Sequence, residues 1–211
     1  KFGIDEVYAI HNGPGLEAGL IGTVAGPIMA AVDSFYIDIK GIGGHGAMPH
    51  QAIDPNIAAA HILLALQSIT SRNVDPLESA VLSICTMSND SAAFNVIPQT
   101  VELGGTVRTL SPEVRDLVEA RINKLVAATA DAFECTVDIN YERGYPVTVN
   151  HDAETDYAVD VAKSIAGEGN VNPDVTPMMA GEDFSYMLEA RPGAYIFLGN
   201  GEGGAMVHHP E

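Results

Sequence analysis

Hydrophobic and polar residues alternate in residues 34–40, which read SFYIDIK. Because successive side chains of a strand point to opposite faces of its sheet, this alternation predicts a half-buried strand. Gly104 and Gly105, within a later strand-like segment, indicate a bulge or a close backbone approach. The segments that we expect to be further strands of the same sheet are residues 79–88, 101–109 and 135–142.

Two helix starts lie between these strands. Asp54 precedes Pro55, and Ser111 precedes Pro112, so each pair places an N-cap residue before a proline at the first helical position. The hydrophobic residues that follow recur at helical spacing. They are Ile62, Leu66 and Ile69 after the first start, and Val114, Val118, Ile122 and Leu125 after the second.

The order of elements across residues 34–142 is therefore β-α-β-β-α-β. This order is typical of the ferredoxin-like α+β arrangement, an antiparallel four-stranded sheet with two helices on one face. The flanking residues 1–31 and 147–211 contain a buried strand at 7–12, a helix at 153–166 and a buried strand at GAYIFLGN. We expect these flanks to form one α/β domain, into which residues 32–146 are inserted.

Composition narrows the classes of function. The net charge is -18 with only ten Lys and Arg residues, so nucleic acid is excluded as a partner by charge repulsion. The longest apolar stretch, residues 62–66, is far short of the ~20 residues that cross a bilayer. Cys85 and Cys135 are isolated, which predicts two small buried hydrophobic residues in a reducing, cytoplasmic compartment.

Histidines provide the first candidate chemistry. His11 ends a predicted buried strand, and ligands bind at such strand ends in α/β sheets, although a structural histidine is the commoner case. His208 and His209 lie in a Gly-rich segment, where an exposed pair is equally ordinary. His45 and His50 lie in a loop whose glycines let the backbone approach a ligand closely; a plain surface loop is the alternative.

Three further polar positions are weak candidates when each is taken alone. Asn95 lies between two predicted strands, where asparagine commonly forms turns. Arg108 lies near the end of the 101–109 strand. Glu182 and Asp183 precede a predicted helix, where acidic residues stabilise the helix N-terminus.

Taken together and in order, these segments resemble a known family. The matching stretches are AIHNGPG, FYIDIKGIGGHGAMPHQAIDP, SRNVDPLESAV, FNVIPQTVELGGTVRTLSPEVRD, YERGYPVTVN, MMAGEDFSYML and VHHPE. They cover nearly the whole chain and are similar to the hippurate hydrolase and indole-acetyl-amino-acid hydrolase branch of the aminoacylase-type metallopeptidases. The resemblance implies an α/β catalytic domain, present here in part, with an inserted ferredoxin-like lid and dimerisation domain.

The resemblance also implies a site with two divalent metal ions, for which Zn, Mn, Co and Ni are all suitable. Of the family's five metal-binding groups, His11 and His208 match two. The others belong to a Cys-Gly-His-Asp segment and a Glu-Glu pair that carries the general base, and this sequence contains neither string. We therefore expect a fragment of a longer hydrolase, inactive by itself and weak in metal binding. A non-catalytic dimerisation or binding module is the alternative.

The resemblance assigns roles to the remaining candidates. The substrates are N-acyl amino acids, whose carboxylate a guanidinium binds in bidentate geometry, so Arg108 is the expected partner and Asn95 a further donor. His45 is expected to stabilise the oxyanion in the active site of the neighbouring subunit of a homodimer. Glu182 is expected to face the metals without binding them.

Overall fold

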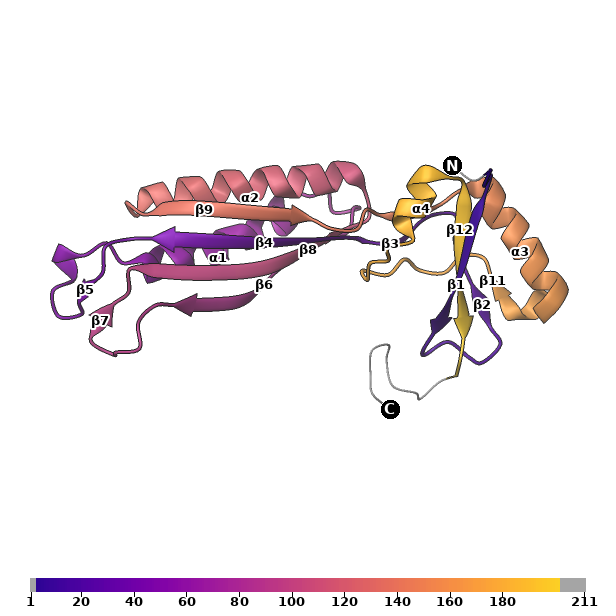
Figure 1. The fold of residues 1–211 in the computed structure, drawn as a ribbon, viewed down its shortest axis with the longest axis horizontal. Helices are drawn as coiled ribbons and strands as arrows, with labels where there is room; N and C mark the ends of the chain where they lie inside the picture. Colours follow the sequence, from indigo (N-terminus) through magenta and orange to yellow (C-terminus); the bar gives the residue numbers. More distant parts are fainter. Residues whose placement is uncertain (1–2, 202–211) are drawn as a thin grey trace. The chain divides into compact units, whose positions relative to one another are not determined.

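The structure is a computed structural model, and it describes residues 3–201 of the 211-residue chain. The chain divides into two compact units. Unit 1 consists of residues 1–30 and 145–211, and unit 2 of residues 31–144 (Figure 1). Both units combine helices with strands, which confirms the prediction of a mixed α/β chain.

Unit 2 contains a four-stranded sheet in the order β6-β8-β4-β9, and every neighbouring pair is antiparallel. Two long helices connect its strands (Figure 1). A two-residue ladder lies beyond the end of β4, where β5 (Gly44–His45) pairs with β7 (Val96–Ile97). The larger elements are β4 (Ala31–Lys40), α1 (Pro55–Arg72), β6 (Ala80–Asn89), β8 (Thr100–Thr109), α2 (Pro112–Ala132) and β9 (Thr136–Arg143), with a 3-10 turn at Pro49–Gln51.

Both predicted helix starts are confirmed. The side chain of Asp54 accepts a hydrogen bond of 2.9 Å from the Asn56 amide at the start of α1. Ser111 accepts one of 3.1 Å from the Val114 amide at the start of α2. Each bond satisfies an amide that has no partner within its own helix.

The core of unit 2 lies between the helices and one face of the sheet. The hydrophobic positions of β4 are fully buried there, beside those of β8 and of both helices. Gly105 lies against the ring of Phe35, where an added Cβ would be 2.2 Å from Cζ. The predicted close approach at this glycine is therefore confirmed.

A bulge falls on the neighbouring strand β6, between Ile84 and Thr86. It leaves Cys85 without a cross-strand partner and exposed, so the prediction that Cys85 is a buried hydrophobic residue is wrong. Cys135 is buried as predicted, and both thiols are free.

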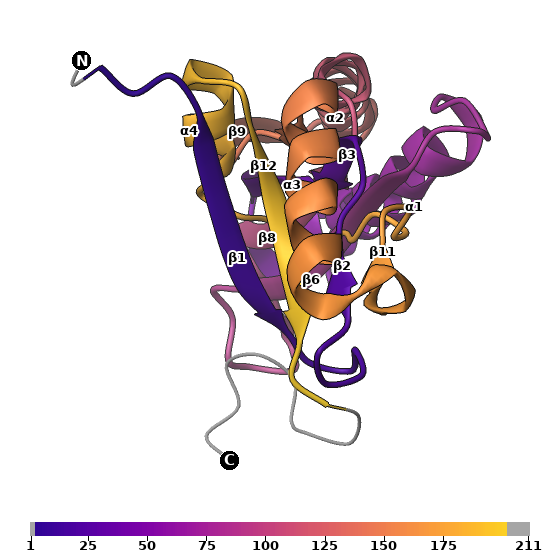
Figure 2. The ribbon, with the colours of Figure 1, turned by 90° about the vertical axis from the view of Figure 1, so that its right-hand side faces the viewer.

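Unit 1 contains a second four-stranded sheet, in the order β1-β12-β2-β11. β1 (Val7–Gly13) pairs in parallel with β12 (Gly193–Gly199). Figure 2 shows α3 (Asp152–Ala166) lying along this sheet beside β12. The remaining elements are β2 (Ile21–Gly22), β3 (Gly26–Met29), β10 (Thr148–Asn150), the 3-10 turn Glu168–Asn170, β11 (Val171–Asn172) and α4 (Ser185–Ala190).

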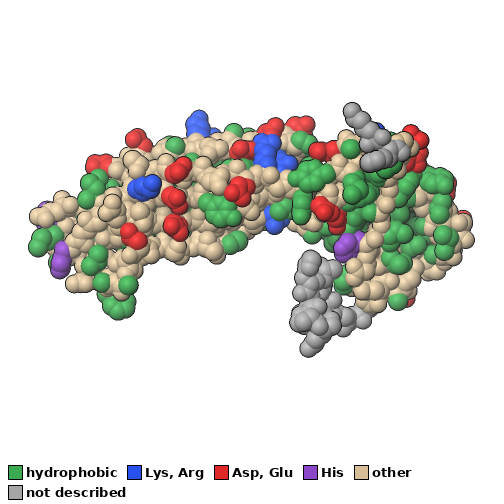
Figure 3. Space-filling view, in the orientation of Figure 1, with side chains coloured by type: hydrophobic (Ala, Val, Ile, Leu, Met, Phe, Trp, Pro, Cys, Tyr) green, Lys and Arg blue, Asp and Glu red, His purple; other side chains and the backbone are tan. Residues whose placement is uncertain are grey.

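Hydrophobic side chains are exposed on one face of unit 1, over β1 and α3 (Figure 3). Ile10 of β1 is 70% exposed and Ile165 of α3 is 80% exposed. β1 is the end strand of its sheet, so its outer backbone edge has no neighbouring strand among residues 3–201. No helix in the same residues is long and apolar enough to cross a membrane.

Candidate functional site

His11 is held in one defined tautomer on β1. Its Nδ1 lies 2.7 Å from the carbonyl oxygen of Asn12, so Nδ1 carries the proton and donates it. The lone pair of Nε2 is then available. Metal-binding histidines characteristically donate their other ring N–H to a carbonyl or carboxylate, so the imidazole of His11 fits a metal ligand.

Glu182 lies on the same side of unit 1, in the segment before α4. Its Oε2 accepts a hydrogen bond of 2.7 Å from the hydroxyl of Tyr195, whose ring centroid is 6.1 Å from that of His11. Burial raises the pKa of Glu182, but hydrogen bonds with Tyr195, Asp183 and the Phe184 amide, together with the nearby His11, lower it by more in total. The net pKa is lowered, so Glu182 is a carboxylate at neutral pH beside the imidazole.

The residues that the structure describes do not form a complete metal site by themselves. Between residues 3 and 201, no group of three or more His, Cys, Asp or Glu side chains converges. His208, the second predicted ligand, lies outside the described residues, as does His209. The proximity of His11 and His208 therefore stays a prediction, and His11 is the described residue that fits a metal.

His45 is held in the opposite tautomer. The backbone amide of Ala47 donates a hydrogen bond of 3.1 Å to Nδ1 of His45. Because Nδ1 accepts, the neutral ring carries its proton on Nε2. The exposed imidazole of His45 therefore presents an N–H donor, which is what an oxyanion requires.

Asn95 lies beside His45. The β5–β7 ladder pairs His45 with Val96, and the Gly46 amide donates a hydrogen bond of 2.7 Å to the carbonyl oxygen of Asn95. The side chain of Asn95 is exposed. Gly46 permits this contact, because a Cβ there would lie 3.2 Å from the same carbonyl oxygen. Two of the predicted site residues thus share one loop cluster at the end of unit 2.

Arg108 lies at the other end of the same sheet. On β4, Lys40 pairs with Thr100 and Val32 pairs with Arg108, so eight residues of β8 separate the two ends. At about 3.4 Å per residue this is roughly 27 Å. In one chain, Arg108 cannot contact the same small molecule as His45.

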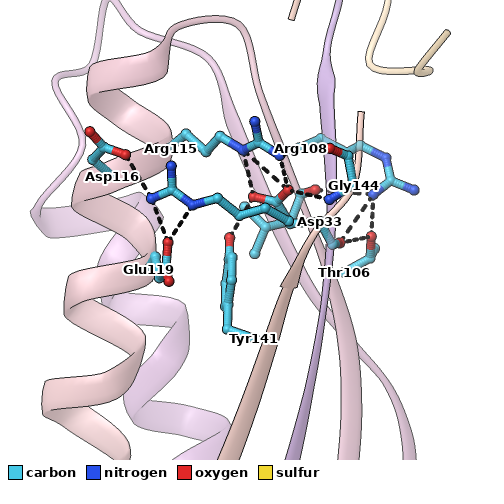
Figure 4. Close-up of polar contacts among 10 residues, drawn as sticks. Asp33, Thr106, Arg108, Arg115, Asp116, Glu119, Tyr141 and Gly144 are labelled. Carbon is cyan, nitrogen blue, oxygen red and sulfur yellow. Dashed lines mark hydrogen bonds and ion pairs between the residues drawn. The ribbon is translucent and has the colours of Figure 1, made fainter. Parts of the chain in front are cut away.

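Arg108 is partly engaged by its own sheet. Its Nη1 contacts the hydroxyl of Thr106 and donates to the carbonyls of Val107, at 3.0 Å, and of Asp33, at 3.4 Å (Figure 4). For the described part of the chain, no hydrogen bond involves Nε or Nη2 of Arg108. The guanidinium can therefore still bind a carboxylate.

A buried polar cluster beside Arg108 was not predicted. Asp33 is 1% exposed and receives hydrogen bonds from Arg115, from the hydroxyl of Tyr141 at 2.8 Å and from the Gly144 amide at 3.2 Å (Figure 4). Burial, then the bond to Asp33, raises the pKa of Tyr141 well above its usual range. The sequence carried a signal: Asp33 is in register with the buried hydrophobic positions of β4, and a carboxylate there requires partners.

Comparison with known proteins identifies the family of this chain. The model of peptidase family M20/M25/M40 matches residues 1–211. The N-acetyl-L-cysteine deacetylase of Bacillus subtilis strain 168 is 41% identical over 208 residues, which are 99% of this chain and 49% of that protein. The hippurate hydrolase of Campylobacter jejuni is 42% identical over 200 residues, 95% of this chain and 52% of that protein.

A solved structure of the same family also matches this chain. It belongs to a Bacillus subtilis protein described as a dinuclear metal-binding peptidase of the M20 family, and it matches with 30% identity and a TM-score of 0.80. The match covers 99% of this chain and 51% of that one. These relatives are named as a deacetylase, a hippurate hydrolase and a metal-binding peptidase. The chain belongs to the peptidase family M20/M25/M40, and it spans about half the length of the relatives it matches.

Proposed function

We propose that this chain is part of a metal-dependent amidohydrolase that cleaves N-acyl amino acids. The observation that carries the proposal is the opposite hydrogen bonding of two imidazoles. His11 donates through Nδ1 and keeps a lone pair on Nε2, whereas His45 accepts at Nδ1 and keeps a proton on Nε2. The first arrangement suits a metal ligand and the second an oxyanion donor.

The proposed metal ions are two divalent cations, for which Zn, Mn, Co and Ni are all suitable. His11 and His208 would hold them, together with groups that this sequence does not contain. When bound, such ions lower the pKa of a coordinated water and polarise the scissile carbonyl. His11 would bind a metal ion through Nε2, while the hydrogen bond from its Nδ1 to the Asn12 carbonyl oxygen fixes the ring.

The substrate would be held at both of its polar ends. Nε2–H of His45 donates to the oxygen that becomes negative in the tetrahedral intermediate, which stabilises that charge. Arg108 pairs with the free carboxylate through Nε and Nη2, the edge of the guanidinium that remains open. Asn95, beside His45, donates to the carbonyl or to the carboxylate.

The separation of His45 from Arg108 supports a site shared between two chains. One substrate is too small to span roughly 27 Å of sheet, so both residues can serve it only if they come from different subunits. We assign unit 2 as a ferredoxin-like lid and dimerisation domain, with edge strands β6 and β9 available for pairing. Two-fold pairing makes the protein a homodimer in which His45 acts on the partner's substrate.

The alternative function is a non-catalytic dimerisation or binding module. Two observations favour it: the chain spans about half the length of its relatives, and residues 3–201 contain no complete metal site. This reading predicts a stable homodimer that binds metal weakly and hydrolyses nothing. The free cysteines agree with a cytoplasmic location for either function.

The deciding experiment compares this chain with the extended protein, by which we mean this chain within a polypeptide of its relatives' length. Both are loaded with Zn, Mn, Co or Ni and assayed on N-acetyl amino acids and on hippurate. We expect hydrolysis that a chelator abolishes in the extended protein and none in the 211-residue chain. An extended protein that binds metal and dimerises but cleaves no N-acyl amino acid contradicts the enzymatic proposal.

A further inference from the structure

Tyr195 is a buried tyrosine that makes one side-chain hydrogen bond, to a carboxylate beside His11. Its hydroxyl donates to Oε2 of Glu182 at 2.7 Å, and the residue is 2% exposed. The other oxygen of Glu182, Oε1, accepts a hydrogen bond of 3.4 Å from the Phe184 amide. Two different elements therefore hold the carboxylate of Glu182, Tyr195 of β12 at Oε2 and the backbone before α4 at Oε1.

The backbone of Tyr195 is fixed on both sides by Asn150, which is 1% exposed. The amide of Tyr195 donates to Asn150 Oδ1 at 2.7 Å, and its carbonyl accepts from Asn150 Nδ2 at 3.0 Å. Thr23 donates to the same carbonyl at 2.9 Å. A residue fixed in this way has little freedom to move its hydroxyl.

The ring of Tyr195 is also enclosed. Its centroid lies 5.9 Å from that of Phe184 and 5.3 Å from that of Phe197, within the core of unit 1. A phenylalanine would fill the core equally well, so packing does not account for the hydroxyl. The hydroxyl has one described function, which is to hold Glu182.

We propose that Tyr195 is a positioning residue that holds the Glu182 carboxylate beside the metal-binding imidazole of His11. The inference rests on the proposed metal site and extends it. A fixed anionic group next to a metal ligand favours binding of a cation, and outer partners of this kind typically change metal affinity about 10–100-fold. Tyr195 acts through Glu182 and touches neither metal nor substrate.

The test measures metal affinity of the extended protein by calorimetry with Mn²⁺ and Co²⁺. We expect Tyr195→Phe to weaken binding about 10-fold or more, and Glu182→Gln to weaken it at least as much. Tyr141→Phe is the matched control, because Tyr141 also donates to a buried carboxylate, Asp33, at 2.8 Å in unit 2. That variant should leave metal affinity unchanged.

A double substitution separates positioning from general stability. If Tyr195 acts through Glu182, Tyr195→Phe has no further effect on metal affinity when Glu182 is already alanine. Additive effects, or a Tyr195→Phe variant that binds metal like the unsubstituted protein, overturn the inference while leaving the proposed function intact. Failure of the unsubstituted protein to bind either metal overturns both.

Discussion

The backbone amide of Ala47 donates a hydrogen bond of 3.1 Å to Nδ1 of His45, and this contact sets which nitrogen of the ring can act. Long-range ¹⁵N–¹H spectra should show Nε2 of His45 protonated at neutral pH. In the extended protein, His45→Ala should lower kcat about 10²- to 10³-fold with little change in KM, because the oxyanion loses one donor.

His50 provides the control for that substitution. It lies five residues later in the same loop region, in the 3-10 turn, and no role is assigned to it. His50→Ala should retain near-normal kcat. Equal losses in the His45 and His50 variants would indicate that the substitutions disturb the loop and not a specific donor.

The ion pair of Arg115 with Asp33 should dominate the electrostatic contribution to the stability of unit 2. Arg115→Met leaves a carboxylate that is 1% exposed without its guanidinium, a change that typically costs about 3–5 kcal/mol. Urea denaturation measures this cost. Arg143→Met removes an exposed pair with Asp116 and Glu119 and should cost about 1 kcal/mol or less. Similar midpoints for the two variants would contradict this account.

Gly105 should not tolerate a side chain. An added Cβ would lie 2.2 Å from the Phe35 ring and 2.4 Å from the Ser83 carbonyl oxygen, which belongs to the backbone and cannot rotate away. We expect Gly105→Ala to destabilise unit 2 by about 1–3 kcal/mol in thermal or urea unfolding. Gly169→Ala, where no atom lies within 4 Å, should be nearly neutral. A Gly105→Ala variant as stable as the unsubstituted protein would contradict this account, because it would mean that β8 can move away from Phe35 and Ser83 at little cost.

The stability of the turn before β7 should depend on pH through the carboxyl group of Asp90. The hydrogen bond from the Thr100 amide is the main cause that lowers the pKa of this carboxyl below 3.8, with a further bond from the Gln99 amide at 3.0 Å. A lowered folded-state pKa stabilises the folded turn above the unfolded pKa, and this contribution is lost as pH falls through the folded value. Carboxyl ¹³C titration should give a midpoint below 3.8. A midpoint at or above 3.8 would mean that the bonds do not persist in solution.

Local signals in the sequence predicted part of this structure. Asp54 and Ser111 cap their helices by contacts within three residues, so the sequence contained all that was needed. The bulge that exposes Cys85 depends on how β6 pairs with β8, and the local sequence pattern does not predict this pairing. The contact of Glu182 with Tyr195 joins two different elements, and the tyrosine resembled any other member of an apolar strand. The site residues were predicted from motif resemblance, whereas their tautomers required three-dimensional contacts.

Subunit mixing tests the central claim, an active site in which the metal ligands come from one chain and His45 comes from a second chain. The extended protein is prepared as His11→Ala and as His45→Ala, each inactive alone, and the two are allowed to exchange subunits. Native mass spectrometry confirms the heterodimers. If His45 acts on the partner's site, each heterodimer has one intact site, and an equal mixture should recover about a quarter of the unsubstituted activity. Heterodimers that form and remain inactive would contradict the account.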